Sequence, residues 1–286
     1  MGFIGLGLRS LAVFALMARA AKRKSLTPRG LVAAVITGLV HAIHPWSIFT
    51  VLLFTFFITG TAFTRVKANV KRTLTASSTG EGGGEGPRNE IQVLANSLPA
   101  TILILIHFFT KTTKCWNSDV LTVGIIAQYA AVTADTWSSE LGILSQQSPI
   151  LITTLRKCPP GTNGGVSRTG LTAALGGGAI IGLMVAMFAP FCHTWSIMAR
   201  LKLVVAITIA GFGGSVLDSL LGAFLQQSVV NDRGKVIEVE GGMKMDLKGK
   251  VISGKNILSN NQVNLVMATL TTLLSMVIAK IYYRFR

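Results

Sequence analysis

The chain has 286 residues, of which 50% are hydrophobic and only 13% are charged. This composition is typical of a polytopic membrane protein and excludes an ordinary soluble enzyme. The formal net charge of +16 would suggest nucleic acid as the partner of a soluble chain, but here Lys and Arg lie between apolar runs. In that position they orient membrane spans and contact anionic lipid headgroups. The interleaved aromatic and basic residues of nucleic-acid sites are missing, so we expect the lipid bilayer, and no nucleic acid, as the partner.

Eight apolar runs are each close to the roughly 20 residues that cross a bilayer. They cover residues 2–18, 30–44, 47–64, 91–110, 119–137, 170–191, 203–226 and 261–280. The first run contains Arg9 and precedes the basic cluster 22–24, whereas a signal peptide carries its charge before the apolar core. We predict an all-α polytopic membrane protein, with residues 1–286 as a single membrane domain. It has eight spans, or seven if the first helix lies in the interface.

Three hydrophilic segments interrupt these runs. Residues 65–90 include the tract GEGGGEGP, whose composition is typical of a flexible linker. Residues 138–169 mix acids, bases and a glycine turn, which is unusual for a simple connection. Residues 228–260 contain the alternating string VIEVEGGMKMDLKGKVI, which favours a small extramembrane hairpin. The glycines of 170–191 are expected to let a neighbouring helix approach closely.

The basic residues give the chain an orientation. Of the 27 Lys and Arg residues, nineteen lie in the segments after the first, third, fifth and seventh runs, and seven lie on the opposite side. The positive-inside rule therefore places segments 65–90, 138–169 and 228–260 in the cytosol, with both termini outside. His41, His44, His107 and His193 then fall at the non-cytosolic face. His41 and His44 could share a metal, although helix ends at the membrane interface are the favoured interpretation.

Polar residues from four parts of the sequence converge on the cytosolic face. Arg88, Gln92 and Asn96 begin one span, Asp135 and Glu140 end another, the glycine turn PPGTNGG follows at 159–165, and Asp218 lies toward the end of a later apolar run. Polar groups in membrane helices are costly unless they face a cavity or a partner, which makes them candidates for a site.

Phosphoryl transfer would suit this set of residues. Asp135 and Asp218 could hold Mg²⁺, which takes one or two carboxylates and leaves its other positions to water and phosphate. A glycine turn can offer backbone N–H groups to an anion, and basic side chains can neutralise phosphate oxygens. The predicted phosphate-binding residues are Arg156, Lys157, Gly161, Thr162, Asn163, Gly164, Gly165 and Arg168. Asp135, Glu140 and Asp218 are the predicted catalytic residues, and Arg88, Gln92 and Asn96 are predicted to bind substrate. On residues alone, an ion or proton transporter using Asp135 and Asp218, and a non-catalytic role, stay open.

The cysteines add little to this picture. Cys115, Cys158 and Cys192 are too few for a disulfide framework, and no C-x-x-C pair indicates zinc. We therefore expect no redox chemistry.

Several strings resemble signature segments of the transmembrane protein 19 family. They are AVTADTWSSELG, PPGTNGGVS, GGSVLDSLLGA, ILSNNQVN, QVLAN at 92–96 and SLTPRG at 25–30, and together they span nearly the whole chain. The resemblance implies a multi-pass membrane protein. Its relatives in plants and cyanobacteria include the phytyl-phosphate kinase of tocopherol synthesis, which converts an isoprenoid monophosphate to the diphosphate with a nucleotide donor. The cysteine pair that some prokaryotic relatives carry before the last span is missing here.

We therefore expect a kinase at the cytosolic face that uses CTP or ATP and Mg²⁺ on a prenyl or phytyl-type monophosphate. The lipid tail would lie between spans. The endoplasmic reticulum or another endomembrane is the expected location. The oligomeric state and the chain length of the substrate cannot be predicted from the sequence.

Overall fold

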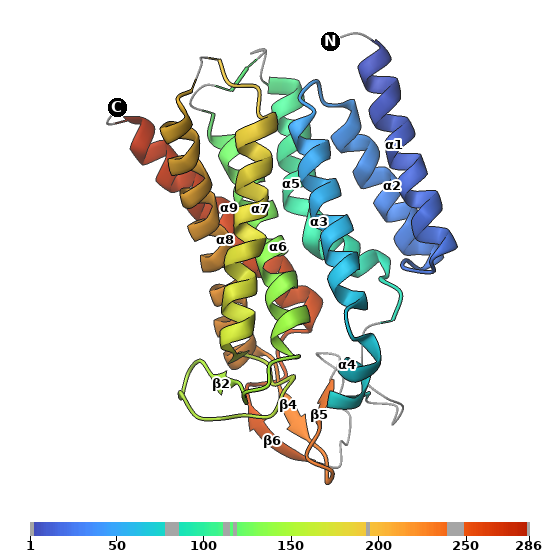
Figure 1. The fold of residues 1–286 in the computed structure, drawn as a ribbon, viewed down its shortest axis with the longest axis vertical. Coiled ribbons are helices and arrows are strands. Elements are labelled where there is room, and N and C mark those ends of the chain that lie inside the picture. Colours follow the sequence, from blue (N-terminus) through green and yellow to red (C-terminus); the bar gives the residue numbers. More distant parts are fainter. Residues whose placement is uncertain are drawn as a thin grey trace.

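A computed structural model describes residues 3–77, 86–110, 115, 116, 119–192, 195–238 and 249–284. In these residues the long helices run side by side along one axis (Figure 1). They are α1 (Phe3–Lys22), α2 (Pro28–Ile43), α3 (Ile48–Arg65), α5 (Glu90–Thr110), α6 (Val120–Gly142), α7 (Arg168–Phe188), α8 (Ile197–Leu225) and α9 (Asn260–Arg284). The short helix α4 (Ala68–Leu74) follows α3. Most of the long helices correspond within a few residues to the predicted apolar runs; α6, α8 and α9 extend further.

A small mixed sheet covers one end of the helical bundle (Figure 1). Its strands are β1 (Thr75–Ser77), β4 (Ser228–Val230), β5 (Val236–Glu238) and β6 (Lys250–Ser253), in the order β1-β5-β4-β6. β4 is antiparallel to β5 and β6, and β1 is parallel to β5. The sheet differs from the simple hairpin that alternation within 228–260 predicts, because β5 uses its second edge to pair with a strand from 65–90. The centre of the glycine tract, residues 78–85, lies outside the described residues.

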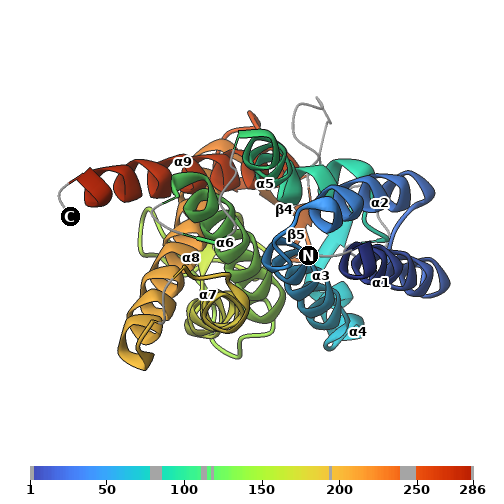
Figure 2. The same cartoon turned by 90° about the horizontal axis from the view of Figure 1, so that it is seen from above.

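Helix α6 forms the centre of the bundle (Figure 2). It packs against α3, α5, α7, α8 and α9, and every residue from Gly124 to Ala134 is buried. Asp119 is the N-cap residue of α6 and accepts hydrogen bonds from the backbone N–H groups of Leu121 and Thr122 at 3.3 and 3.1 Å. An enclosed helix presents its polar side chains to protein and not to lipid.

Small residues allow α7 and α8 to approach α6. A methyl group at Gly177 would come within 2.7 Å of the Ala134 Cα, and one at Gly214 within 2.4 Å of the Ala131 Cβ. Close contact between small residues is a principal source of helix association in membranes, because lipid and Leu side chains are equally apolar. The packing role that the sequence predicts for the glycines of this region is confirmed.

The outer surface of the bundle is apolar. Large side chains such as Phe14, Ile36, Phe109, Ile209 and Ile278 are exposed on different helices. Within the described residues, five helices are long and apolar enough to cross a membrane by length and composition: α3, α5, α7, α8 and α9. A surface of this kind on a helical bundle defines a multi-pass integral membrane protein.

The end of the bundle opposite the sheet is joined by a disulfide. Cys115, from the α5–α6 connection, bonds to Cys192, from the α7–α8 connection. Next to it the Trp116 ring stacks on the Phe191 ring, with the ring centroids 5.6 Å apart. The backbone N–H of Trp116 donates to the Pro190 carbonyl at 2.6 Å. The cysteine count did not predict this bond, because 77 residues separate the two thiols in sequence and only the helix packing brings them together. Disulfides are typical of oxidising compartments, and the distribution of basic residues predicts the non-cytosolic side for this same end.

We expect the double variant Cys115→Ser/Cys192→Ser to lose about 2–4 kcal/mol of its free energy of unfolding, because a long loop is no longer closed. Its unfolding temperature should fall accordingly. Thermal unfolding of the purified protein in detergent, with and without reductant, measures this. Reduction should destabilise the wild type by the same amount and leave the double variant unchanged. The control Cys158→Ser should keep its sensitivity to reductant, and a wild type insensitive to reductant would contradict the prediction.

Candidate functional site

The acidic residues of α6 face two different neighbours. Asp135 and Glu140 are five residues apart, so they lie on different faces of the helix and about 7 Å apart along its axis. Asp135 faces α8, where the Ser215 hydroxyl donates to its Oδ1 at 3.2 Å. Glu140 faces α3 and α4. The three predicted catalytic residues therefore do not form one cluster; Glu140 is separated from the pair Asp135 and Asp218.

Asp135 and Asp218 form an acid pair between α6 and α8. Asp218 lies one turn after Gly214, which packs on Ala131 one turn before Asp135. The two carboxylates are near enough to interact electrostatically, and Asp218 Oδ1 is enclosed without a hydrogen-bond partner among the described residues. An enclosed carboxylate oxygen of this kind needs a proton or a cation. No group of three or more His, Cys, Asp or Glu side chains suited to a metal occurs in the described part of the chain.

Glu140 is the centre of a separate ionic network. Lys71 of α4 donates to its Oε2 at 2.5 Å, and the Thr64 hydroxyl donates to its Oε1 at 2.6 Å. The Lys71 ammonium also donates to the Phe63 carbonyl at 2.7 Å, and Arg88 donates to the Thr64 hydroxyl at 3.2 Å. The side chains of Lys71 and Glu140 are only 10% and 12% exposed, so the pair is nearly desolvated. It fixes α4 against the ends of α3 and α6.

This network forms one wall of a basic pocket at the same end of the bundle as the sheet. The pocket is lined by Arg23, Lys24, Ser25, Thr61, Thr64, Arg65, Ala68, Lys71, Arg72, Gly86, Pro87, Arg88 and Glu140. Six of these side chains are cationic and one is anionic, so the pocket is strongly electropositive and suited to phosphate. Lys24 holds a left-handed backbone conformation with φ of 49°, which disfavours any residue but glycine or asparagine. Strained residues of this kind gather at functional sites.

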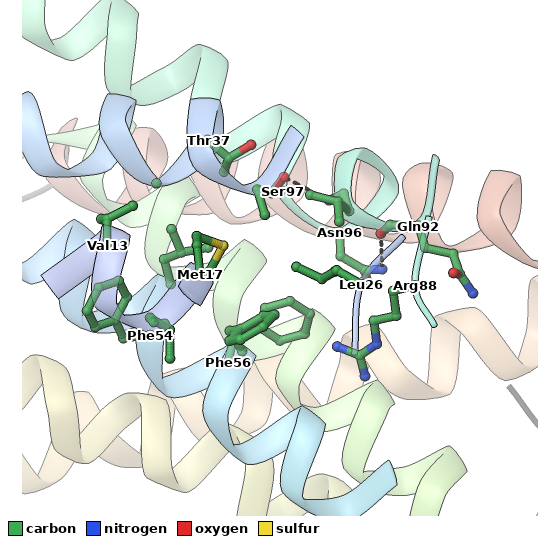
Figure 3. A pocket seen from close by; sticks show the side chains of 16 residues that line it. Val13, Met17, Leu26, Thr37, Phe54, Phe56, Arg88, Gln92, Asn96 and Ser97 are labelled. Carbon is green, nitrogen blue, oxygen red and sulfur yellow. Dashed lines mark hydrogen bonds between the residues drawn. The ribbon is translucent and has the colours of Figure 1, made fainter. Parts of the chain in front are cut away.

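An apolar cavity lies beside the basic pocket, between α1, α2, α3 and α5. It is lined by Val13, Leu16, Met17, Leu26, Ala34, Thr37, Gly38, Leu53, Phe54, Phe56, Phe57, Arg88, Gln92, Val93, Asn96 and Ser97. Figure 3 shows that Arg88, Gln92 and Asn96 stand at one end and that Val13 and Phe54 stand toward the other. All three predicted substrate-binding residues thus line this cavity. Gln92 also has a structural role, because its Oε1 accepts the Asn89 N–H at 2.9 Å in a reciprocal capping box that begins α5.

The glycine turn packs against β4 and α8. The Asn163 N–H donates to the Ser228 hydroxyl at 2.9 Å, and the Gly165 and Thr162 N–H groups donate within the turn at 2.9 and 3.3 Å. Gly164 has a φ of 77° and lies against α8, where an added methyl group would come within 2.4 Å of the Ala223 Cβ. These glycines let the turn approach α8 near the end that carries Asp218. The backbone N–H groups of Thr162, Asn163 and Gly165 already donate hydrogen bonds within the protein.

The basic residues around the turn are on the surface. Arg156, Lys157 and Arg168 have exposed side chains and line neither cavity. Cys158 is half-buried beside them, and burial raises the pKa of its thiol, an effect that a hydrogen bond with Thr162 opposes. The role of Arg156, Lys157 and Arg168 in phosphate binding stays a prediction.

His41, His44 and His107 are buried. His44 Nε2 and His107 Nδ1 are 2.9 Å apart, and His107 Nε2 lies 3.0 Å from an Asp119 oxygen. His41 pairs with the Tyr129 hydroxyl at 2.6 Å. His41 and His107 lie in the last turns of α2 and α5, and His44 caps α2, so the expected position at helix ends is confirmed, while α2, α3, α5 and α6 enclose the rings. His193 lies outside the described residues.

Sequence reasoning missed most of the basic pocket. Arg23, Lys24, Arg65, Lys71 and Arg72 were used only to orient the spans, since charge at a span end serves topology and ligand binding equally well. The density of cations directly after the first and third apolar runs was the available signal. Only the packing of α4 against α3 and α6 turns that density into a pocket.

The fold and this site define a multi-pass integral membrane protein with a cationic pocket at one end. The chain belongs to the family described as integral membrane protein DUF92, which matches residues 11–272, and the family predicted from the signature strings is confirmed. It is 38% identical over 276 residues to Protein PGR of Arabidopsis thaliana, with 92% of each chain covered. It is 30% identical to uncharacterized membrane proteins of Methanocaldococcus jannaschii and Synechocystis, with 78% and 73% of this chain and 83% and 76% of theirs covered. No solved structure matches the chain.

Glu140→Gln should destabilise the protein by about 3–5 kcal/mol, because it leaves the Lys71 ammonium nearly buried without its counter-charge. Replacing both partners, as in Lys71→Met/Glu140→Gln, should recover most of that loss relative to Glu140→Gln, since no charge then remains desolvated. Thermal or denaturant unfolding of the four members of this double-mutant cycle measures the coupling. Equal destabilisation in the single and double variants would show that the pair is not a unit.

Proposed function

We propose that this protein is a nucleotide-dependent kinase that converts an isoprenoid or phytyl-type lipid monophosphate to the diphosphate at the cytosolic face of a membrane. The observation that carries the proposal is the meeting, at one end of the bundle, of a carboxylate pair and a pocket lined by six cations. Phosphoryl transfer depends on positioning and on electrostatic stabilisation of phosphate oxygens, and these are the groups it needs.

The acid pair suits a divalent cation. Asp135 and Asp218 would hold Mg²⁺, and the partnerless Asp218 Oδ1 fits such a ligand. Bound there, the ion would supply charge neutralisation for the phosphoryl group. Ser215, which donates to Asp135, would keep that carboxylate oriented toward α8.

The cations would hold the phosphates of both reactants. One oxygen of the lipid monophosphate forms a bond to the γ-phosphorus of CTP or ATP, while the bond from that phosphorus to its bridging oxygen breaks. The products are the lipid diphosphate and a nucleoside diphosphate. Arg88 lies next to α6: a methyl group on Gly60 would come within 3.4 Å of Thr136 and 3.6 Å of the Arg88 guanidinium. Because Thr136 follows Asp135 in sequence, Arg88 lies at the level of the acid pair along the axis of α6. The exposed Arg156, Lys157 and Arg168 would attract the anionic nucleotide to this end.

The orientation supports access from the cytosol. We propose eight spans, with the sheet, the basic pocket and the glycine turn in the cytosol and the Cys115–Cys192 bond in an oxidising lumen or outside. The disulfide and the basic residues are independent arguments for the same orientation. A lumen of this kind favours the endoplasmic reticulum or another endomembrane.

Asp218→Asn and Asp135→Asn should each lower kinase activity at least a hundredfold, because each removes a charge from the acid pair. The assay incubates purified protein with radiolabelled CTP or ATP, Mg²⁺ and geranylgeranyl or phytyl monophosphate, and separates the lipid diphosphate. The control Asp232→Asn changes an exposed acid in the β4–β5 turn and should keep full activity.

No diphosphate with either nucleotide would overturn the proposal. If proteoliposomes containing the wild type instead carried an ion or proton flux without nucleotide, and Asp218→Asn abolished that flux, the acid pair would belong to a transporter.

A further inference from the structure

A small hairpin of residues 149–158, which contains strand β2 (Ile150–Leu151), projects from the connection between α6 and α7 (Figure 1). We infer that this hairpin is an interfacial anchor, which places an apolar tip in the adjacent leaflet of the membrane and binds anionic lipid headgroups through its basic residues. In the proposed orientation this is the cytosolic leaflet, whose surface is negatively charged. The anchor lies outside the basic pocket and the acid pair, so the inference does not rest on the proposed function.

Backbone hydrogen bonds hold this hairpin in one shape. The Leu155 N–H donates to the Leu151 carbonyl at 2.8 Å, and the Leu151 N–H donates to the Arg156 carbonyl at 2.8 Å. The Cys158 N–H donates to the Pro149 carbonyl at 3.0 Å and closes the base of the hairpin. The tip is therefore a tight turn with an i to i+4 hydrogen bond, and the side chains on it have fixed directions.

The turn displays an apolar side chain at its tip. Leu155 is 73% exposed, and its φ of 55° lies in the left-handed region that disfavours leucine. Ile150, on the strand that leads to the tip, is 38% exposed. A single exposed leucine on a protein surface is ordinary, but a leucine that is held outward in a strained conformation indicates a contact surface.

Cations without a counter-charge accompany this apolar tip. Arg156 and Lys157 follow it directly, Arg168 begins α7, and all three side chains are exposed. None of the three is in a salt bridge among the described residues, and the sequence contains no Asp or Glu between Glu140 and Asp218. Their anionic partners therefore come from outside the chain. An apolar surface with Lys and Arg beside it is typical of segments that lie on an anionic membrane.

The hairpin lies at the level where the apolar surface of the bundle ends. Phe224, one residue before the end of α8, is still 60% exposed, so this surface reaches the end of that helix. Figure 1 shows the segment around β2 beside the lower ends of α7 and α8, whereas the sheet extends further from the helices. Lipid headgroups occupy the level where apolar spans end, so the tip of the hairpin is within their reach.

The hairpin is connected directly to the glycine turn. The Ile152 N–H donates to the Gly164 carbonyl at 3.0 Å, and β2 pairs antiparallel with β3 (Gly165–Val166). A methyl group on Gly164 would come within 2.8 Å of the Ser219 carbonyl oxygen, and Ser219 follows Asp218 on α8. Contact between the hairpin and the headgroups therefore fixes the depth of the glycine turn and of this end of α8 relative to the lipid phosphates.

Fluorescence quenching in lipid nanodiscs tests the anchor without substrate or nucleotide. The fluorophore NBD is attached to the full-length protein at Thr154→Cys, an exposed position beside the tip, in a Cys158→Ser background. The control label is at Asp232→Cys, in the β4–β5 turn, which lies at the end of β4 away from α8. We expect phosphatidylcholine with a spin label near its headgroup to quench NBD at position 154 at least threefold more than at position 232. Added phosphatidylglycerol should increase this difference.

Variants separate the apolar tip from the charges. Leu155→Asn suits the left-handed backbone and removes the apolar side chain, so it should lower lipid quenching at position 154 at least twofold without lowering the unfolding temperature. Arg156→Gln/Lys157→Gln should abolish the increase that phosphatidylglycerol causes, because each cation near an anionic surface strengthens the attraction about fivefold. The matched control Arg233→Gln/Lys250→Gln removes two exposed charges at the far end of the sheet and should leave the quenching unchanged.

Several results would overturn the inference. They are equal lipid quenching at positions 154 and 232, quenching at 154 that phosphatidylglycerol does not change, and quenching at 154 that Leu155→Asn leaves intact. Equal access of aqueous iodide to the two labels would show that the tip is in water and would also overturn it. None of these measurements involves phosphoryl transfer, so the anchor and the kinase proposal can fail separately.

Discussion

The enclosure of α6 is the constraint on which the rest of the structure depends. Glycines on α7 and α8 let both helices approach its backbone, so nearly a dozen consecutive residues of α6 are buried. A helix surrounded in this way can carry Asp135 and Glu140 without exposing a carboxylate to lipid, where the cost would be several kcal/mol. The same packing that stabilises the bundle therefore allows its polar chemistry.

The five-residue spacing on α6 divides that chemistry between two neighbours. Asp135 turns toward α8 and forms the acid pair with Asp218, while Glu140 turns toward α3 and α4 and holds Lys71. Through Thr64 the Glu140 network reaches Arg88, which belongs to both the basic pocket and the apolar cavity. The acid pair, the cationic pocket and the apolar cavity are thus connected through side chains of a single helix. In the proposed kinase the acid pair would hold the cation and the cationic pocket would hold the phosphates.

The opposite end of the bundle is built differently. There Asp119 begins α6 and lies against His107, which pairs with His44, and all three side chains are buried. The disulfide joins the two connections above them. One end is closed and cross-linked and the other carries pockets and exposed cations, which matches an oxidising side and a cytosolic side.

The sequence by itself determined the class, the family and the positions of the helices, because hydropathy and motif strings are local properties of the chain, and its loop charges predict an orientation. It also predicted that Arg88, Gln92, Asn96, Asp135, Glu140 and Asp218 lie toward one end of the bundle, the end that carries the sheet (Figure 1). Only the tertiary structure decided how they group. Asp135 and Glu140 point from α6 toward different neighbouring helices, which separates Glu140 from the acid pair. The packing of α4 against α3 brings the basic residues at the ends of the helices together as a pocket. The contact between two connections far apart in sequence allows the disulfide to form. These depend on contacts between segments far apart in sequence, and no local pattern records them.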